Sequence, residues 1–260
     1  MSKPKKQRSG FSNDLKIPTA KKHLPDNSVN HTLKEQQANA LMNQGKLQES
    51  EAIYTELIID GTRNHIVYGN LAAIYLMQGR HDKSIPLLNK SLELKPNNSG
   101  AHINLGNALQ AQGDLNTAIA SYRKAIEINP NYAEAHSNLG NALKAQGDLN
   151  AAIASFNTVL QLKPDYANAH FNLGNALKEQ DDLNAAIDSF CRALQFKSNF
   201  QEARINLGNV LQEKGDLTAA ITSYNKAIEI KPNYPNAHNN LGIALNEQGN
   251  LNAAIASFNT

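Results

Sequence analysis

Most of the chain consists of copies of one stretch, SGAHINLGNALQAQGDLNTAIASYRKAIEINPNY, at residues 99–132. Its leucines recur 34 residues apart, the glycines that follow them do the same, and a set of prolines recurs at multiples of that spacing: Leu105, Leu139, Leu173, Leu207, Leu241, Pro96, Pro130, Pro164 and Pro232. A fixed period of this length is the sequence signature of a stacked repeat protein, so the period decides the fold before any other feature does.

Each unit predicts two helices. Leu105, Ala108 and Leu109 lie at i, i+3 and i+4, which predicts an amphipathic first helix over residues 100–112 that ends at Gly113. The second helix follows within two or three residues and ends before Pro130. We expect asparagines to serve as its N-caps: Asn116, Asn150, Asn184 and Asn252.

A glycine lies inside the first helix of each unit, where glycine costs about 1 kcal/mol relative to alanine. Gly106 and its counterparts are therefore interpreted as the points where the two helices cross too closely for a side chain. The unit resembles the tetratricopeptide repeat (TPR), whose aromatic, Leu-Gly, Ala-x3-Phe and Pro signature corresponds here to His102, Leu105, Gly106, Ala118, Tyr122 and Pro130. The resemblance implies an all-α fold, a right-handed α-solenoid of stacked antiparallel helix pairs.

The chain divides into a basic tail and the solenoid. Residues 1–30 carry seven basic residues against two aspartates, a formal charge of +5, and three prolines, so we expect a disordered tail. The tail is either a solvated leader or an electrostatic tether to RNA or anionic lipid. The solenoid, residues 31–260, comprises the repeats 31–64, 65–98, 99–132, 133–166, 167–200, 201–234 and 235–260.

Two repeats depart from the pattern in informative ways. Repeat 31–64 is degenerate, with Thr62 at the proline position, and in repeat 167–200 Asp181 replaces the helix-ending glycine, a position that aspartate tolerates. Repeat 235–260 stops about halfway through its second helix. We expect the 260 residues to be the front part of a longer protein; the alternative is a natural end with a frayed helix.

Composition excludes several classes of protein. Only Cys191 is present, so there is no internal disulfide framework, and no run of about 18 apolar residues could span a membrane. No secretory leader is found, and the expected compartment is the cytoplasm. No phosphate-binding loop, dinucleotide fingerprint, HExxH helix or nucleophile elbow occurs, so we expect no cofactor, no catalytic residue and no enzyme activity from these residues.

Histidines recur at one position of the repeat and could suggest a metal site: His102, His136, His170 and His238. Neighbouring helices pack about 8–10 Å apart, whereas zinc ligands lie about 2 Å from the ion, so one ion cannot bind this row. The histidines occupy the aromatic packing position of the family. No metal site is predicted.

Asparagines form the remaining pattern. They recur at two positions of the first helix, three residues apart and hence on one face, and the candidate peptide-binding residues are Asn104, Asn107, Asn138, Asn141, Asn172, Asn175, Asn206, Asn209 and Asn240. Asparagine forms helices poorly, so its repetition favours a role in binding. The alternative is that these amides only bond neighbouring repeats.

The NLGNALK wording of the repeats is most similar to the superhelix of O-linked N-acetylglucosamine transferases, which implies a concave groove whose asparagines contact a peptide backbone. The first hypothesis is thus a scaffold that binds extended polypeptide in such a groove. The second is the substrate-recruiting region of a glycosyltransferase whose catalytic domain lies beyond residue 260. A third, binding of nucleic acid by the tail, is disfavoured, and the oligomeric state and the identity of the partner stay open.

Overall fold

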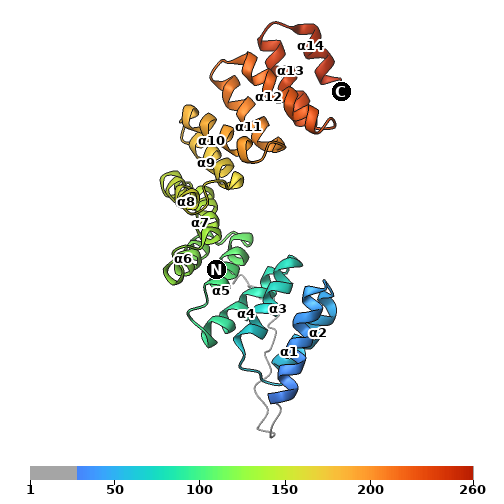
Figure 1. Cartoon of the computed structure of the whole chain (residues 1–260), viewed down its shortest axis with the longest axis vertical. Coiled ribbons are helices and arrows are strands. Elements are labelled where there is room, and N and C mark those ends of the chain that lie inside the picture. The colour runs from blue at the N-terminus through green and yellow to red at the C-terminus, as the bar shows by residue number, and fades with distance from the viewer. Residues whose placement is uncertain (1–27, 260) are drawn as a thin grey trace, which may run out of the picture. The chain divides into compact units, whose positions relative to one another are not determined.

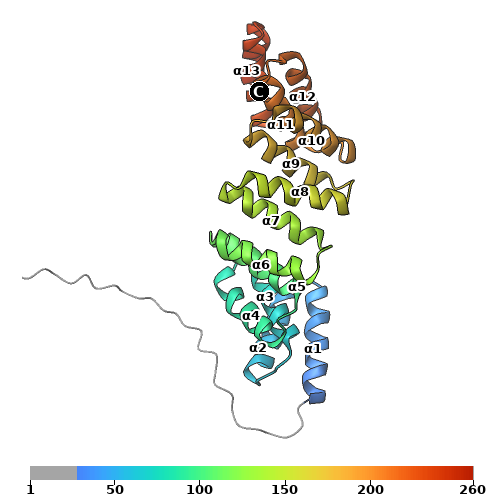
Figure 2. The same ribbon diagram turned by 90° about the vertical axis from the view of Figure 1, so that its left-hand side faces the viewer.

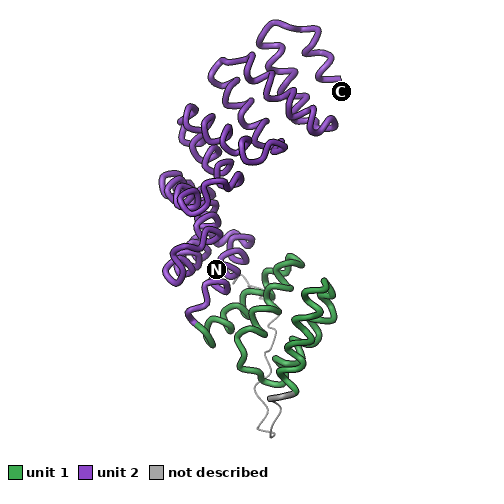
Figure 3. Tube along the Cα trace, in the orientation of Figure 1, with its two compact units in different colours: residues 1–95 green, residues 96–260 purple. Residues whose placement is uncertain are grey.

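The computed structural model describes residues 28–259, and in these residues it contains fourteen helices and no strand. The helices fall into two compact units (Figure 3), which are described separately. The first unit ends at Lys95 and contains four helices: α1 (Ser28–Asn43), α2 (Leu47–Ile59), α3 (His65–Met77) and α4 (His81–Leu94). The predicted tail lies outside the described residues, except that Ser28 to Asn30 already belong to α1.

The second unit begins at Pro96 and contains ten helices in five antiparallel pairs (Figures 1 and 2). They are α5 (Ser99–Ala111), α6 (Leu115–Ile128), α7 (Ala133–Gln146), α8 (Leu149–Leu162), α9 (Ala167–Glu179), α10 (Leu183–Phe196), α11 (Gln201–Glu213), α12 (Leu217–Ile230), α13 (Pro235–Glu247) and α14 (Leu251–Phe258). Each pair packs on the next, as in α6 against α7 and α8 against α9. The predicted all-α solenoid of 34-residue repeats is confirmed. We refer to the odd-numbered helix of each repeat as helix A and to its even-numbered partner as helix B.

The close crossing of helices A and B is the centre of each repeat. A Cβ atom placed on Gly106 would lie 2.4 Å from the ring of Tyr122, and one on Gly174 would lie 2.7 Å from the ring of Phe190. Both rings are fully buried and cannot yield. The predicted reason for the mid-helix glycines is thus confirmed. In repeat 65–98 the equivalent buried positions hold Ala72 and Leu88, so alanine replaces the glycine where leucine replaces the larger ring.

Helix A ends where the sequence predicts. Gly113 has φ of 82° and Gly147 has φ of 90°, the left-handed conformation that closes a helix. Asp181 adopts φ of 67° at the same position, as expected from its tolerance of this region. Helix B of repeat 167–200 ends at Phe196 although Ser198 replaces the proline, so the proline supports this boundary without being required for it.

The predicted N-caps of helix B are wrong. The caps are the aspartates two residues earlier, as in Asp114, whose carboxylate accepts the backbone N–H of Thr117 at 3.1 Å, and Asp148, which accepts that of Ala151 at 3.1 Å. Asn250 fills this position before α14. An aspartate after the helix-ending glycine is in the right place to accept an N–H three residues on, whereas the predicted asparagines already lie inside the first helical turn. The residues corrected are Asn116, Asn150, Asn184 and Asn252.

Candidate functional site

The candidate peptide-binding asparagines all lie on helix A. In the second unit they are partly exposed on α5, α7, α9, α11 and α13, while the leucine and glycine between them are buried against helix B. The two positions in each helix are three residues apart and therefore share a face. We call the set the asparagine ladder, with a first row, Asn104, Asn138, Asn172, Asn206 and Asn240, and a second row, Asn107, Asn141, Asn175 and Asn209.

The two rows interlock between repeats. The Nδ2 of Asn138 donates to Oδ1 of Asn107 at 2.9 Å, so the first row of one repeat bonds the second row of the repeat before it. The same bond joins the other repeats of this unit: Asn172 to Asn141 at 3.1 Å, Asn206 to Asn175 at 2.7 Å and Asn240 to Asn209 at 2.9 Å. The amides thus bond neighbouring repeats, as one of the two interpretations of the sequence holds. Each bond uses one of the two N–H groups of the first-row amide and one of the two lone pairs of the second-row oxygen.

The first unit carries one step of the same kind. Asn70 Nδ2 donates to Oδ1 of Asn39 at 2.7 Å and lies 3.0 Å from the Tyr54 hydroxyl. Position 73, which corresponds to the second row in repeat 65–98, holds alanine. Asn104 is the first-row residue of the following repeat, and among the described residues its side chain has no hydrogen-bond partner.

Buried aromatics of helix B contribute to the ladder, which the sequence analysis missed. The Tyr122 hydroxyl lies 2.8 Å from Oδ1 of Asn107 and 2.9 Å from Oε1 of Gln110. The Tyr224 hydroxyl makes the same two contacts, with Asn209 at 2.8 Å and Gln212 at 3.0 Å. The signal was present, because tyrosine accompanies glutamine twelve residues earlier in both repeats.

A separate set of hydrogen bonds, outside the ladder, joins successive repeats where helix A ends and helix B begins. Gln146 Nε2 donates to Oδ1 of Asn116, Gln180 donates to Asn150 at 2.6 Å, and the Nζ of Lys214 donates to Asn184. The residues first expected to cap helix B therefore join successive repeats. Their side chains are more exposed than those of the ladder.

Charged side chains beside the ladder are paired along helix A. Lys144 Nζ donates to Glu179 at 2.7 Å, and Lys178 lies 3.6 Å from Glu213. Glu247 accepts a bond from neutral Gln212 at 2.9 Å, so no cation compensates its charge in this row. These charged residues beside the ladder therefore carry a small net negative charge.

The histidine row has a structural role. The Nε2 of His102 lies 3.0 Å from the carbonyl oxygen of Pro96, and that of His136 lies 2.8 Å from the carbonyl oxygen of Pro130. His170 and His238 make the equivalent contacts, and in the remaining repeat Arg204 donates to the Ser198 carbonyl at 2.8 Å. The row thus ties the start of helix A to the preceding loop. Residues 28–259 contain no cluster of metal-ligating side chains.

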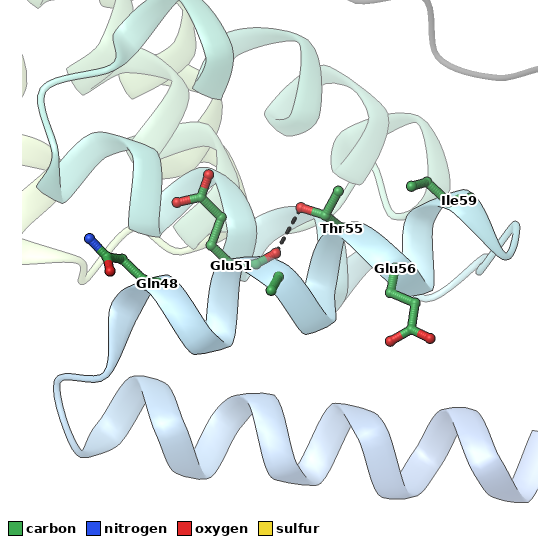
Figure 4. A pocket seen from close by; sticks show the side chains of 6 residues that line it. Gln48, Glu51, Thr55, Glu56 and Ile59 are labelled. Atoms are coloured by element: carbon green, nitrogen blue, oxygen red, sulfur yellow. Dashed lines mark hydrogen bonds between the residues drawn. The ribbon is translucent and has the colours of Figure 1, made fainter.

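A hollow on the first unit does not form a second site. It is lined by residues of α2 alone, of which Figure 4 labels Gln48, Glu51, Thr55, Glu56 and Ile59. Its two carboxylates already have partners: Glu51 accepts from Arg80 at 3.0 Å, and Glu56 accepts from Lys34 at 2.8 Å. A single helix provides no opposite wall for a ligand. Within residues 28–259 every helix is too short or too polar to span a bilayer.

Comparisons with known proteins agree with this geometry. Family models described as "TPR repeat" match residues 110–147, 140–181 and 208–249, and models described as "Tetratricopeptide repeat" match residues 65–98, 87–120 and 167–200. A comparison with curated proteins gave no match. The more specific resemblance, to the repeats of O-linked N-acetylglucosamine transferases, stays a prediction.

Solved structures share the fold. A crystal structure of MamA is 32% identical over 60% of this chain and 91% of its own, with a TM-score of 0.57. YrrB is 21% identical over 71% of this chain and 95% of its own, with a TM-score of 0.60, and a TPR protein from Cytophaga hutchinsonii is 17% identical over 86% and 93%, with a TM-score of 0.72. With its glycine-centred helix pairs and its matches to repeat models along the array, the chain belongs to the tetratricopeptide repeat family.

Proposed function

We propose that the chain is a scaffold without catalytic activity, and that its asparagine ladder binds an extended segment of another polypeptide. The observation that carries the proposal is the bonding capacity left on partly exposed amides. After donating to Asn107, the Asn138 side chain keeps one N–H and its carbonyl oxygen. A peptide unit also offers one donor and one acceptor, so a row of such amides can bind main chain with little demand on sequence.

Spacing supports an extended ligand. Because Asn138 on one helix A bonds Asn107 on the helix A before it, successive A helices lie about one helix-packing distance apart, about 8–10 Å. A chain in the polyproline II conformation rises about 3.1 Å per residue. One repeat therefore spans about three ligand residues, which is one turn of polyproline II. A ligand in that conformation would present the same face to each successive rung of the ladder.

Charge supports a neutral or basic ligand. Lys144 and Lys178 are engaged by carboxylates, and Glu247 lies beside the ladder without a cationic partner in its row. Complementary charge raises association rates and penalises acidic segments. Peptide binding has a precedent in the same fold, since YrrB is described as a TPR protein with an unusual peptide-binding site.

The test replaces three first-row asparagines, Asn138, Asn172 and Asn206, with alanine. The probe is ribonuclease A, reduced and alkylated with iodoacetamide so that it stays unfolded, and its affinity is measured by fluorescence anisotropy. Each amide contact contributes about 0.5–1.5 kcal/mol, so the triple variant should bind at least about tenfold more weakly.

The chain offers a matched control, the triple alanine variant of Asn116, Asn150 and Asn184. These residues also bond the next repeat but lie off the ladder. Their replacement should leave affinity unchanged. Equal losses in the two variants, or no loss in the ladder variant at an unchanged melting temperature, would contradict the proposal.

A further inference from the structure

The second row of the ladder occurs in two forms. In repeats 99–132 and 201–234, helix B places a tyrosine hydroxyl beside the second-row asparagine, as Tyr122 does for Asn107. In repeats 133–166 and 167–200 the same buried position holds Phe156 and Phe190. We call the first two the Tyr repeats and the second two the Phe repeats.

The hydroxyl decides how many bonding positions the asparagine retains. An amide oxygen has two lone pairs. The Oδ1 of Asn107 accepts from Asn138 at 2.9 Å. The Tyr122 hydroxyl lies 2.8 Å from the same oxygen and 2.9 Å from Oε1 of Gln110, so it fills the space beside Oδ1 whichever of the two oxygens takes its single proton. Among the described residues, Oδ1 of Asn141 accepts only from Asn172, and Oδ1 of Asn175 accepts only from Asn206.

The hydroxyl stays in place across the physiological pH range. Burial, with a smaller contribution from the Glu247 charge, raises the pKa of Tyr224 to about 12. Burial likewise raises the pKa of Tyr122 far above its usual range. Both hydroxyls therefore remain protonated donors.

A second position changes together with the aromatic. The Tyr repeats carry Gln110 and Gln212, whose amide oxygens lie beside the hydroxyls, whereas the Phe repeats carry Lys144 and Lys178 there. Lysine has no acceptor for a hydroxyl proton, and both lysines face carboxylates of the next repeat instead. In the Tyr repeats a buried hydroxyl holds the second-row amide from the side of helix B, whereas in the Phe repeats, among the described residues, only the asparagine of the next repeat bonds its oxygen.

We infer that Asn141 and Asn175 form the centre of the peptide-binding surface, and that the aromatic of helix B is a positioning residue that determines whether a repeat engages the ligand. The inference rests on the proposed function and extends it. With no hydroxyl to hold it on the buried side, the partly exposed amide of these two asparagines can turn toward the ligand, so that its oxygen accepts a ligand N–H while Nδ2 donates to a ligand carbonyl. Because the two lie in adjacent repeats, their contacts are about three ligand residues apart.

The test moves the hydroxyl. The variant Phe156→Tyr/Phe190→Tyr gives the Phe repeats the hydroxyl of the Tyr repeats, and it should bind unfolded ribonuclease A about 5- to 100-fold more weakly. The reciprocal variant, Tyr122→Phe/Tyr224→Phe, should bind as tightly as the wild type or more tightly. Loss of affinity in both variants, or in neither, would overturn the inference.

A further variant guards against misfolding. Phe156→Tyr/Lys144→Gln reproduces the native Tyr122 and Gln110 arrangement in repeat 133–166, and Lys144→Gln alone is its control. The double variant should weaken binding at an unchanged melting temperature, and the control should not. If the triple asparagine variant loses binding while these tyrosines have no effect, the proposed function stands and this inference fails; if the asparagines also have no effect, both fail.

Discussion

Helix A carries two faces that recur with the same period for different reasons. One face meets helix B, where a Cβ atom added to Gly174 would lie only 2.7 Å from the Phe190 ring, and both the glycine and the ring are buried. The other face carries the asparagine ladder, which is partly exposed and joined by single hydrogen bonds such as that from Asn172 to Asn141 at 3.1 Å.

The comparison distinguishes two kinds of recurring residue: glycines that helix packing requires, and asparagines that helix packing does not explain. No side chain fits at the crossing, so glycine there follows from steric exclusion. On the ladder, alanine would be the better helix former and one partly exposed amide bond contributes little. The cost of substitution should therefore fall steeply from the first face to the second.

The largest effect is expected at the crossing. Gly174→Val forces a branched side chain against a fully buried ring, and the loss should reach the upper end of the about 1–3 kcal/mol typical of overpacking. Urea unfolding measures it. The pair Gly174→Ala/Phe190→Leu copies Ala72 and Leu88 of repeat 65–98 and should be more stable than Gly174→Ala alone. If the double variant is less stable than Gly174→Ala alone, the close approach of the Phe190 ring is not the reason for the glycine.

An intermediate effect is expected at the helix cap. Asp148→Ala removes the acceptor for the Ala151 N–H and should cost about 1 kcal/mol. Asn150→Ala, two residues on, is the matched control and should cost less, because among the described residues the Asn150 side chain accepts a bond from Gln180 and makes no cap. Urea unfolding also compares these two variants, and a larger loss of stability for Asn150→Ala would contradict the assignment of the cap.

The smallest effect is expected on the ladder. Asn172→Ala removes one partly exposed hydrogen bond and gains helix propensity, so the two changes nearly offset and stability should shift by less than about 0.5 kcal/mol. Differential scanning calorimetry detects a change of this size. A loss of several kcal/mol would mean that the ladder exists to hold repeats together.

The sequence predicts the fold well because its determinants are local and repeat. The apolar spacing around Leu105, the left-handed residue at Gly113 and the exclusion of side chains at Gly106 each follow from one helix or one crossing. The cap prediction failed because two polar residues, Asp114 and Asn116, lie close together, and only the turn geometry shows which one reaches the helix.

The site was predicted in part. The spacing of Asn104 and Asn107 places both rows on one face, but it does not show that each row bonds the other in the next repeat. That depends on how the repeats stack. The division into Tyr and Phe repeats was present in the sequence as the paired change of Tyr122 with Gln110 and Phe156 with Lys144, yet its meaning depends on the hydroxyl contacts.

The most direct measurement is of the ladder amides themselves. Side-chain NH₂ groups of asparagine give separate signals in nitrogen–proton correlation spectra, and single Asn→Gln variants assign them. On titration with unfolded ribonuclease A, the account predicts shifts of the Asn138, Asn141, Asn172 and Asn175 signals, the largest at Asn141 and Asn175, while Asn116 and Asn150 stay unchanged. Binding that shifts Asn116 and Asn150 but leaves the ladder signals in place would contradict it.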